Sequence, residues 1–546
     1  MKYVKFSRIV AILLAVLTCS GGLLALPAYA ADENAENNQA DEEYEAKKAA
    51  YREKIKSDDI TTDDFLIGSW VSFYSFDIHN YEYQLDQMAE AGVNFNIFPK
   101  NFGAGYMFDA AYWEDVEAQY AKRNMVYLMN GDMYEKNIAP GVEYAQGKEH
   151  CIGYHVVDEP WDNALEWVAY ISQKYRELDP TRYPFTNLYP SYAAGDRLGG
   201  TYYEYISKYV ELTGPENIEY LSHDYYPFPA SGTIHSGIFA DMEVVRKVAY
   251  ENGKLKTHAF PQSTAWTGMR MPNATEMRWN VYAYLAYGFK ALSWFNLVCP
   301  GSSDSEGEGF HDSLIYRDGT IRDPELFAAW SDLNWEIRGL SDILMNQDVA
   351  HAYHVHKTTK GVEYLPEDFF LIPKGKNDFI VSVMEPKEGE DKYIMLFNKN
   401  IERNSTCHFS VNTTEVKWLE YFDPHIGEYI PVEFKNGMFE DDFLPGEGRL
   451  YRLRYDAPPS ETEKPAETST EAPTESATEI TTEISTESAT EMKTESADTE
   501  STEKQTDVIT EAEASDKGGC GSTISVGAVV LSAAAAAIVA SKRKRK

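Results

Sequence analysis

Two adjacent acids that follow an apolar run are the first candidates for chemistry. Residues 152–157 predict a strand, and Asp158, Glu159 and Pro160 follow it directly. Carboxylates beside a buried strand are unfavourable unless they are paired or functional. The pair is therefore typical of general acid and base chemistry. The alternative is a surface loop leading into the cap of the next helix.

A third acid follows another apolar run, in the segment Leu221-Ser222-His223-Asp224-Tyr225-Tyr226-Pro227-Phe228. We interpret Asp224 as a group that orients a substrate hydroxyl or serves as a second carboxylate. Tyr225 or Tyr226 would then donate a hydrogen bond to a substrate oxygen. The alternative is an ordinary turn that contains aspartate and proline.

Both segments resemble known enzymes. The Asp-Glu-Pro motif at 158–160 resembles the motif that ends strand four in a large clan of barrel glycosidases, and the Asp-x-Tyr-Pro pattern at 224–227 is similar to the end of strand six in related barrels. The resemblance covers the layout of residues 60–345. It implies a glycoside hydrolase of oligo- or polysaccharides without metal or organic cofactor. It further implies that Glu159 is the proton donor and that Asp158 lies near sugar C2.

Other residues near strand-like runs are candidates for contacting a sugar. A tryptophan in the place of Trp294 commonly forms the floor of a sugar subsite, although core packing is the alternative. The further candidates for substrate contact are Asn296 after the eighth run, His258 and Gln262 in and after the seventh, Asn187 and Tyr189 at the fifth, Asn130 at the third and Trp70 at the first.

The seventh run departs from the resemblance, because no acid follows it. The clan has a nucleophilic glutamate there, whereas the next glutamate, Glu276, lies on the following helix near Arg278 and predicts a structural ion pair. Three explanations stay open. Asp224 is the second carboxylate, or the 2-acetamido group of the substrate is the nucleophile with Asp158 polarising it, as in substrate-assisted hexosaminidases. In the third, the barrel binds sugar without cleaving it.

The elements that must position these residues alternate along residues 61–346. Eight strand-helix units over roughly 280 residues have the size of a TIM barrel. A doubly wound sheet is the alternative, but no glycine-rich phosphate loop follows the first strand. Strands are predicted at 65–76, 93–99, 125–130, 152–157, 183–188, 218–222, 255–260 and 291–297. Helices are predicted at 81–91, 112–122, 163–178, 202–212, 239–250, 275–287 and 324–344, with a short irregular segment after the third strand.

Residues 347–456 change character. Short alternating runs at 378–384, 392–398 and 449–455 are separated by turn residues. This pattern predicts a small antiparallel β-sandwich. The predicted fold is therefore α/β, a (β/α)8 barrel followed by a β-sandwich.

The two flanks predict export and anchoring. Residues 1–30 combine basic residues, an apolar run and a small-x-small site, which is typical of a secretory signal. Residues 31–60 are an acidic segment with a possible helix at 43–56. Residues 457–517 form a Thr/Ser/Glu-rich linker, which we expect to be a disordered stalk. Residues 518–546 hold an apolar run and five terminal basic residues, which predict a transmembrane anchor.

These signals predict an extracellular protein held at the cell membrane or surface. The segment 519–522 resembles tail signals of some Gram-positive surface proteins. A lipid anchor at Cys19 is the weaker alternative, because Thr18 is a poor residue before a lipidated cysteine.

Composition excludes some classes of function. The net charge of -37 argues against a nucleic-acid partner, which needs a basic surface. Cys151, Cys299, Cys407 and Cys520 lack CxxC spacing, so neither a zinc site nor a disulfide framework is predicted. The alternative to an enzyme is a non-catalytic carbohydrate-binding surface protein. A lyase or deacetylase is a third hypothesis, but no histidine cluster suggests the deacetylase metal.

Overall fold

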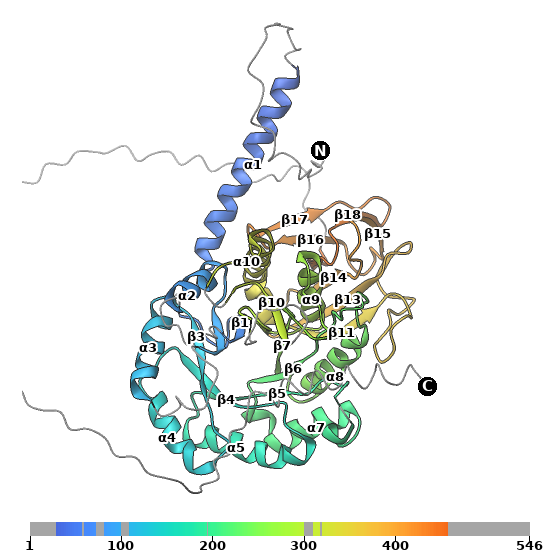
Figure 1. Cartoon of the computed structure of the whole chain (residues 1–546). Helices are drawn as coiled ribbons and strands as arrows, with labels where there is room; N and C mark the ends of the chain where they lie inside the picture. The colour runs from blue at the N-terminus through green and yellow to red at the C-terminus, as the bar shows by residue number, and fades with distance from the viewer. Residues whose placement is uncertain are drawn as a thin grey trace, which may run out of the picture. The chain divides into compact units, whose positions relative to one another are not determined.

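The computed structural model describes residues 29–56, 59–71, 81–99, 109–193, 195–299, 309–316 and 319–456. A closed parallel barrel is followed by antiparallel sheets, drawn in yellow to orange in Figure 1. The predicted barrel and the antiparallel region after it are therefore confirmed. Residues 1–28 of the predicted signal, the linker and the anchor lie outside the described residues. None of the described helices combines the length and apolar character needed to cross a membrane.

The eight barrel strands follow one another in chain order. They are β1 (Leu66–Val71), β2 (Phe95–Phe98), β3 (Val126–Asn130), β4 (Cys151–Asp158), β5 (Tyr183–Leu188), β6 (Tyr220–Asp224), β7 (Lys256–Phe260) and β9 (Ala291–Trp294). Parallel pairing of β1 with β9 closes the barrel. Gly68 lies in this seam, where a Cβ atom would stand 2.7 Å from Phe95 Cδ1 and 2.9 Å from Ser293 Oγ. Glycine at this position therefore lets the two strands approach.

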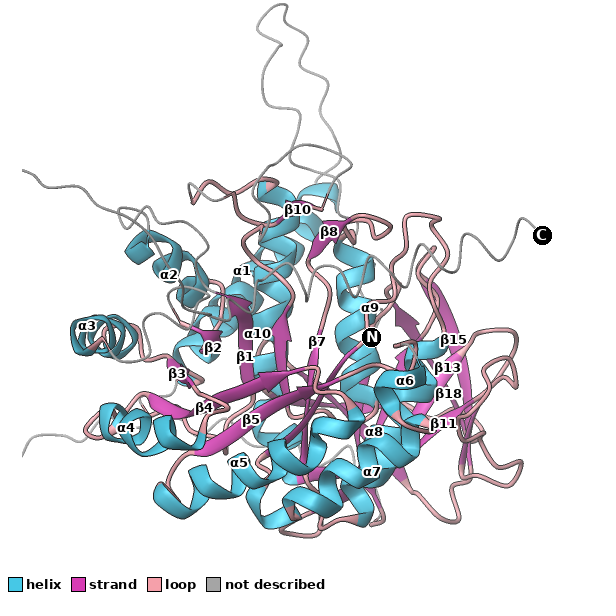
Figure 2. Cartoon of the chain, turned by 60° about the horizontal axis from the view of Figure 1, so that its bottom comes forward, coloured by secondary structure: helices cyan, strands magenta, loops and turns pink. Residues whose placement is uncertain are grey.

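Helices cover the outside of the barrel (Figure 2). They are α2 (Tyr81–Glu90), α3 (Ala110–Ala121), α4 (Glu135–Ala145), α5 (Leu165–Leu178), α7 (Tyr202–Thr213), α8 (Gly237–Glu251), α9 (Ala274–Ala286) and α10 (Pro324–Asn346). Helix α4 replaces the irregular segment predicted after β3. The prediction was wrong there because Pro140 and Gly141, both poor helix formers, lie inside this helix.

Local capping and small additions complete the barrel. Helix α9 begins with a capping box between Asn273 and Glu276. Glu276 also accepts two hydrogen bonds of 2.6 Å from Arg270, so its ion pair is with Arg270 and not with Arg278. A short helix, α6 (Gly195–Leu198), precedes α7, and β8 (Thr264–Trp266) pairs with β10 (Phe310–Ser313) in the loops.

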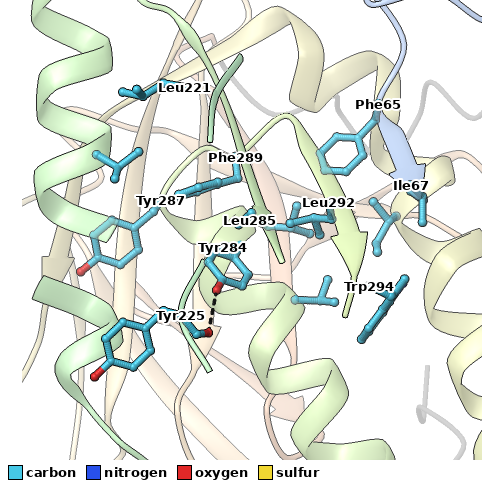
Figure 3. Packing of buried hydrophobic residues seen from close by; sticks show 14 of the residues in the cluster. Phe65, Ile67, Leu221, Tyr225, Tyr284, Leu285, Tyr287, Phe289, Leu292 and Trp294 are labelled. Atoms are coloured by element: carbon cyan, nitrogen blue, oxygen red, sulfur yellow. Dashed lines mark hydrogen bonds between the residues drawn. The ribbon is translucent and has the colours of Figure 1, made fainter. Parts of the chain in front are cut away.

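Strand residues alternate between two apolar layers, because successive side chains point to opposite faces of a sheet. The inner layer fills the barrel and includes Leu66, Phe95 and Phe185. The outer layer lies between strands and helices, and Figure 3 shows part of it, including Leu221 and Leu292. The face on which a residue lies therefore decides whether it can reach a site inside the barrel mouth.

The antiparallel region consists of two sheets. The larger sheet holds β11 (Gln347–His354), β13 (Phe379–Pro386), β14 (Tyr393–Asn398), β19 (Gly448–Arg454), β16 (Trp418–Asp423) and β17 (Glu428–Val432), and the smaller holds β12 (Leu371–Pro373), β15 (Ser405–Val411) and β18 (Met438–Phe443). The Phe379 ring lies 5.4 Å from Phe409 and 5.1 Å from Phe443, which joins the two sheets. The larger sheet also contacts the barrel helices, since Ser382 Oγ donates a hydrogen bond of 2.6 Å to the carbonyl of Ala286.

An N-terminal helix, α1 (Tyr29–Lys54), precedes the barrel. The sequence predicted a helix only over residues 43–56. Tyr51 donates a hydrogen bond of 3.0 Å to the carbonyl of Gly339, and Arg52 forms an ion pair of 2.7 Å with Asp332. These contacts hold α1 against α10.

Candidate active site

Three carboxyl groups lie at the carboxyl ends of neighbouring barrel strands. Asp158 ends β4, Glu159 follows it, and Asp224 ends β6. Asn187 on β5 lies between them: its Nδ2 atom donates a hydrogen bond of 3.1 Å to Asp158, and its side chain is also hydrogen-bonded to Asp224. In a TIM barrel, active sites occupy this end of the strands.

A β-bulge turns Asp158 toward the interior. The register of β4 against β5 shifts between His155 and Val157, after which Asp158 pairs with Asn187. His155 faces the inner layer, with its ring 5.3 Å from Trp70, whereas both Val156 and Val157 contact the outer layer. Without the extra residue, simple alternation would turn Asp158 toward the helices.

The backbone of Glu159 has an unusual conformation. Its φ angle is 46°, in the left-handed region that residues with side chains rarely adopt. Its N–H donates a hydrogen bond of 2.9 Å to the carbonyl of Asn187, and Tyr205 donates one of 2.6 Å to the carbonyl of Pro160. Strained residues held in this way are concentrated at functional sites.

The surroundings push the three carboxyl groups to different pKa values. Burial raises the pKa of Asp158 to about 6, while the Asn187 hydrogen bond lowers it. Burial and then the charge of Asp158 raise the pKa of Asp224 to about 8. Burial, then Asp224 and Asp158, raise the pKa of Glu159 well above its usual value, against the opposing charge of Arg197. Asp158 is therefore more acidic than Asp224, and the Glu159 carboxyl group is held toward its protonated form, as acid–base catalysis requires.

The two adjacent tyrosines point to opposite faces. Tyr226 is hydrogen-bonded to the Asp224 carboxyl group. Tyr225 lies in the outer layer, where its ring is 5.0 Å from Tyr192 and its carbonyl accepts a hydrogen bond of 3.2 Å from Tyr284 (Figure 3). Of the two candidates, Tyr226 therefore lies with the acids, and the expectation for Tyr225 is corrected.

Trp294 does not lie in the barrel mouth. Its side chain is fully buried in the outer layer (Figure 3). Its Nε1 atom donates a hydrogen bond of 3.0 Å to Asn334 on α10, and its ring lies 6.3 Å from Trp330. The core-packing alternative is thus correct, because a ring enclosed by α10 cannot form the floor of a sugar subsite.

Three further candidates are buried and occupied by protein partners. The side-chain nitrogen of Gln262 donates to the carbonyls of Thr264 and Arg270, at 3.1 and 2.8 Å. Asn296 Oδ1 accepts a hydrogen bond of 3.0 Å from Ser69 Oγ. His258 lies between the hydroxyls of Ser222 and Ser293, both at 2.9 Å. The bonded atoms of these side chains support the strand ends, and the polar atoms of Gln262 and His258 are all bonded within the protein. The Asn296 Nδ2 atom has no hydrogen-bond partner among the described residues, so its contact with a sugar stays a prediction.

The remaining candidates lie at the carboxyl ends of other strands. Tyr189 follows β5, and its hydroxyl accepts a hydrogen bond of 3.3 Å from Arg197. Trp70 is 7% exposed in the inner layer, with its ring 4.9 Å from Phe98. Asn130 ends β3 and pairs with His155 of β4. Tyr189 is within electrostatic reach of Glu159 and Asp158, whereas Trp70 and Asn130 lie near the carboxyl ends of β1 and β3.

Sequence reasoning missed Trp161, Tyr192 and Arg197. Trp161 and Tyr192 are 45% and 43% exposed, which is unusual for large aromatic rings. The Arg197 guanidinium lies 5.7 Å from the Trp161 ring and 5.3 Å from the Tyr189 ring. The position of Trp161, two residues after Glu159, was a usable signal. Arg197 lies on the short helix α6, which no sequence pattern indicated.

Nothing in this arrangement indicates a metal centre. Across the part of the chain that the structure describes, no three His, Cys, Asp or Glu side chains are grouped so as to hold a metal ion. The site instead offers carboxyl groups, Tyr226 and exposed aromatic rings, which suit acid–base chemistry on a polar organic substrate.

The sequence matches no model of a known protein family and no curated protein sequence. Solved structures with a similar chain path include three carbohydrate-active enzymes. An α-amylase of Geobacillus thermoleovorans, in complex with acarbose, is 10% identical, with 72% of this chain and 99% of that chain covered at a TM-score of 0.44. A β-galactosidase of Bacillus circulans sp. alkalophilus is 9% identical, with 73% and 100% covered at 0.48. A family 5 glycoside hydrolase of Bacteroides vulgatus is 11% identical, with 71% and 89% covered at 0.44. At these identities and TM-scores, the strand pairing of this chain remains the evidence for its fold, and the activities belong to those proteins.

Proposed function

We propose that the chain is a glycoside hydrolase in which Glu159 protonates the glycosidic oxygen. The observation that carries the proposal is the convergence of three carboxyl groups at the barrel mouth, where Asp158 ends β4, Glu159 follows it and Asp224 ends β6. The pKa of Asp158 is about 6, that of Asp224 about 8, and that of Glu159 is raised well above its usual value. A proton donor next to a carboxylate is what cleavage of a glycosidic bond requires.

The pKa values of Asp158 and Asp224 also indicate which group replaces the nucleophilic carboxylate that is missing after β7. A second carboxylate acting as nucleophile or base must be ionised, and the raised pKa disfavours this for Asp224 at neutral pH. Asp158 is the more acidic neighbour, and it lies beside Glu159. These features favour a substrate-assisted reaction in which the 2-acetamido oxygen attacks C1, Asp158 stabilises the positive charge on the acetamido group, and Glu159 protonates the leaving oxygen. The proposed substrates are therefore glycans with 2-acetamido sugars.

The exposed aromatic rings support binding of a sugar. Trp161 and Tyr192 present accessible faces near the acids, and aromatic rings stack on the apolar faces of pyranoses. Arg197 beside Trp161 adds hydrogen-bond donors for hydroxyl groups. These groups come from the loops after β4 and β5, which adjoin the three carboxyl groups.

The role of Glu159 is tested by Glu159→Gln, which keeps the size of the side chain and removes its proton. Loss of a general acid typically lowers the rate by about 10²–10⁴-fold. The loss should be smaller on aryl glycosides with good leaving groups, because these need little protonation. Glu166→Gln, an exposed exchange on α5, is the matched control and should retain activity. Full activity of Glu159→Gln on a natural glycan would contradict the assignment.

Matched aryl glycosides that differ only at C2 test the substrate class. Cleavage confined to N-acetyl sugars, lost in Asp158→Ala and retained in Asp224→Asn, would support substrate assistance. Equal rates on 2-hydroxy sugars would rule it out and favour Asp224 as the second carboxylate. Binding of longer glycans without any cleavage would favour the non-catalytic carbohydrate-binding alternative.

We also propose that the enzyme is exported and held at the cell surface. The basic and apolar character of residues 1–30 supports export. The apolar run and basic end of residues 518–546 support a membrane anchor, with residues 457–517 as the spacer. An extracellular position suits an enzyme whose substrate is a glycan.

A further inference from the structure

A continuous chain of hydrogen bonds crosses the barrel interior and ends on Asp158. Ser293 Oγ lies 2.9 Å from His258 Nε2, and His258 Nδ1 lies 2.9 Å from Ser222 Oγ. Ser222 Oγ donates to Asn187 Oδ1 at 3.0 Å, and Asn187 Nδ2 donates to Asp158 Oδ1 at 3.1 Å. The five residues come from β9, β7, β6, β5 and β4, so the chain links five strands.

The donor and the acceptor of each hydrogen bond in this series can be assigned. Burial and the nearby charge of His223 lower the pKa of His258 to about 3, so its ring is neutral and carries one N–H. The single hydroxyl proton of Ser222 is directed to Asn187 Oδ1. Ser222 Oγ must therefore accept from His258 Nδ1–H, and His258 Nε2 accepts from the Ser293 hydroxyl. Every donor then points toward Asp158.

This direction favours a charged Asp158, because a carboxylate oxygen accepts a hydrogen bond more strongly than the oxygen of a protonated carboxyl group. In the reverse direction the amide of Asn187 would turn its oxygen to Asp158, and that contact needs a proton on the carboxyl group. Hydrogen bonds in such a chain polarise one another in the same sense, which strengthens the last donation to the carboxylate. A hydrogen bond to the charged form of an acid favours that form.

We propose that Ser222, His258 and Ser293 are positioning residues that fix the Asn187 amide with its nitrogen toward Asp158 and so hold Asp158 as the carboxylate of the site. The proposal rests on the proposed function for its effect on catalysis. These three side chains are buried within the barrel, so they act on Asp158 through Asn187 and not by contact with the substrate. The proposal therefore adds positioning residues to the proposed function.

Other groups also act on the charge of Asp158. Glu159 adjoins it on the chain, and Asp224 faces it from β6; their charges are coupled to that of Asp158. Tyr189 after β5 and Tyr226 after β6 also face it. Ser222→Ala leaves these four side chains in place, but release of Asn187 also affects its hydrogen bond to Asp224, so the titration of Asp158 must be followed separately from that of Asp224.

The test is the pH dependence of kcat/KM in the full chain with Ser222→Ala. The acid limb, assigned to ionisation of Asp158, should move to higher pH by roughly half a unit to one unit, because Asn187 is released from its orientation. Ser222→Thr keeps the hydroxyl and should restore the limb. Ser382→Ala is the matched control, since it also removes a buried hydrogen bond of 2.6 Å but lies in β13. It should leave the limb unchanged.

A second measurement separates this inference from the proposed function. Infrared difference spectra of the carboxyl groups, referenced to Asp158→Asn, report the titration of Asp158 without any substrate. If no glycoside is cleaved, the proposed function fails. The shift of the Asp158 titration in the infrared spectra then still tests the role of the hydrogen-bond series. If Ser222→Ala does not fold, Ser293→Ala takes its place and should shift the titration in the same direction. An unchanged Asp158 titration in a folded variant of either kind would overturn the inference.

Discussion

Asp224 should make the protein less stable as pH rises, so Asp224→Asn should stabilise it at neutral pH. The side chain is 6% exposed, and among the described residues its Oδ1 atom has no hydrogen-bond partner. Its folded-state pKa of about 8 lies above the ordinary 3.8. A group with a raised folded pKa contributes stability that is complete below the unfolded pKa and is lost as pH rises through the folded pKa. The window is therefore between pH 4 and pH 8.

The size of the effect follows from the pKa difference. About 3 pH units separate the ordinary pKa of Asp224 from pH 7, and each corresponds to about 1.4 kcal/mol, so the carboxyl group destabilises the fold by up to about 4 kcal/mol at pH 7. At pH 4 the same reasoning leaves less than about 1 kcal/mol. For a folded unit of roughly 430 residues, 4 kcal/mol corresponds to a rise in Tm of about 4 °C.

The assay is thermal and urea unfolding of the wild type and Asp224→Asn at pH 4 and pH 7. Asn keeps an oxygen that can accept from Tyr226 and Asn187, so the change between the two pH values isolates the ionisation. Asp179→Asn is the control of opposite sign. Burial would raise the pKa of Asp179, but hydrogen bonds from Thr181, Tyr154 and Arg182 outweigh it, and the pKa is lowered. Relative to the wild type, that variant should lose stability as pH rises from 4 to 7, because the ionised Asp179 stabilises the wild type above its unfolded pKa.

Equal effects of Asp224→Asn at pH 4 and pH 7 would refute the reasoning, because they would show that Asp224 is ionised without penalty in the folded protein. The second-carboxylate role of Asp224 would then regain support. Loss of activity together with a gain of stability would show that Asp224 is kept for function rather than for folding, and it would count against the substrate-assisted reaction.

Two further changes test the substrate side and the location. Trp161→Ala should raise KM for oligosaccharides roughly tenfold with little change in kcat, since stacking on an exposed ring stabilises substrate and transition state alike. The control is Trp167→Ala, because Trp167 on α5 is equally exposed at 45%. A large fall in kcat of Trp161→Ala would instead show that Trp161 acts on the reacting bond. Deleting residues 524–546 should release an active, folded enzyme into the medium; retention of the truncated chain in the membrane fraction would place the anchor elsewhere, with Cys19 the next candidate.

The order of strands and helices in the barrel could be predicted from the sequence, because each element carries its own apolar pattern. All eight barrel strands lie within or next to the predicted runs. The acids were also found from the sequence, since Asp158, Glu159 and Asp224 interrupt apolar patterns at strand ends. Helix α4 was missed because Pro140 weakens its local preference, and packing on the barrel overrides that preference.

The sequence predicted only in part whether a strand side chain points to the inner or the outer layer of the barrel. Alternation along β6 places Ser222, Asp224 and Tyr226 on one face and Tyr225 on the other, so the error for Tyr225 was avoidable. The same alternation assigns Trp294 to the outer layer, because its neighbour Ser293 contacts His258 inside the barrel. Strand periodicity was the relevant signal in both cases.

Asp158 shows what only the tertiary structure decided. Alternation from His155 would turn its carboxyl group toward the helices, and the bulge in β4 reverses this. A bulge arises from the pairing of β4 with β5, and local sequence does not reveal it. The protonation states likewise depend on burial and on charges from other strands, which are set when the barrel closes. The sequence alone therefore determined which acids are present and on which strands, whereas closure of the barrel decided which way they face and which of them hold protons.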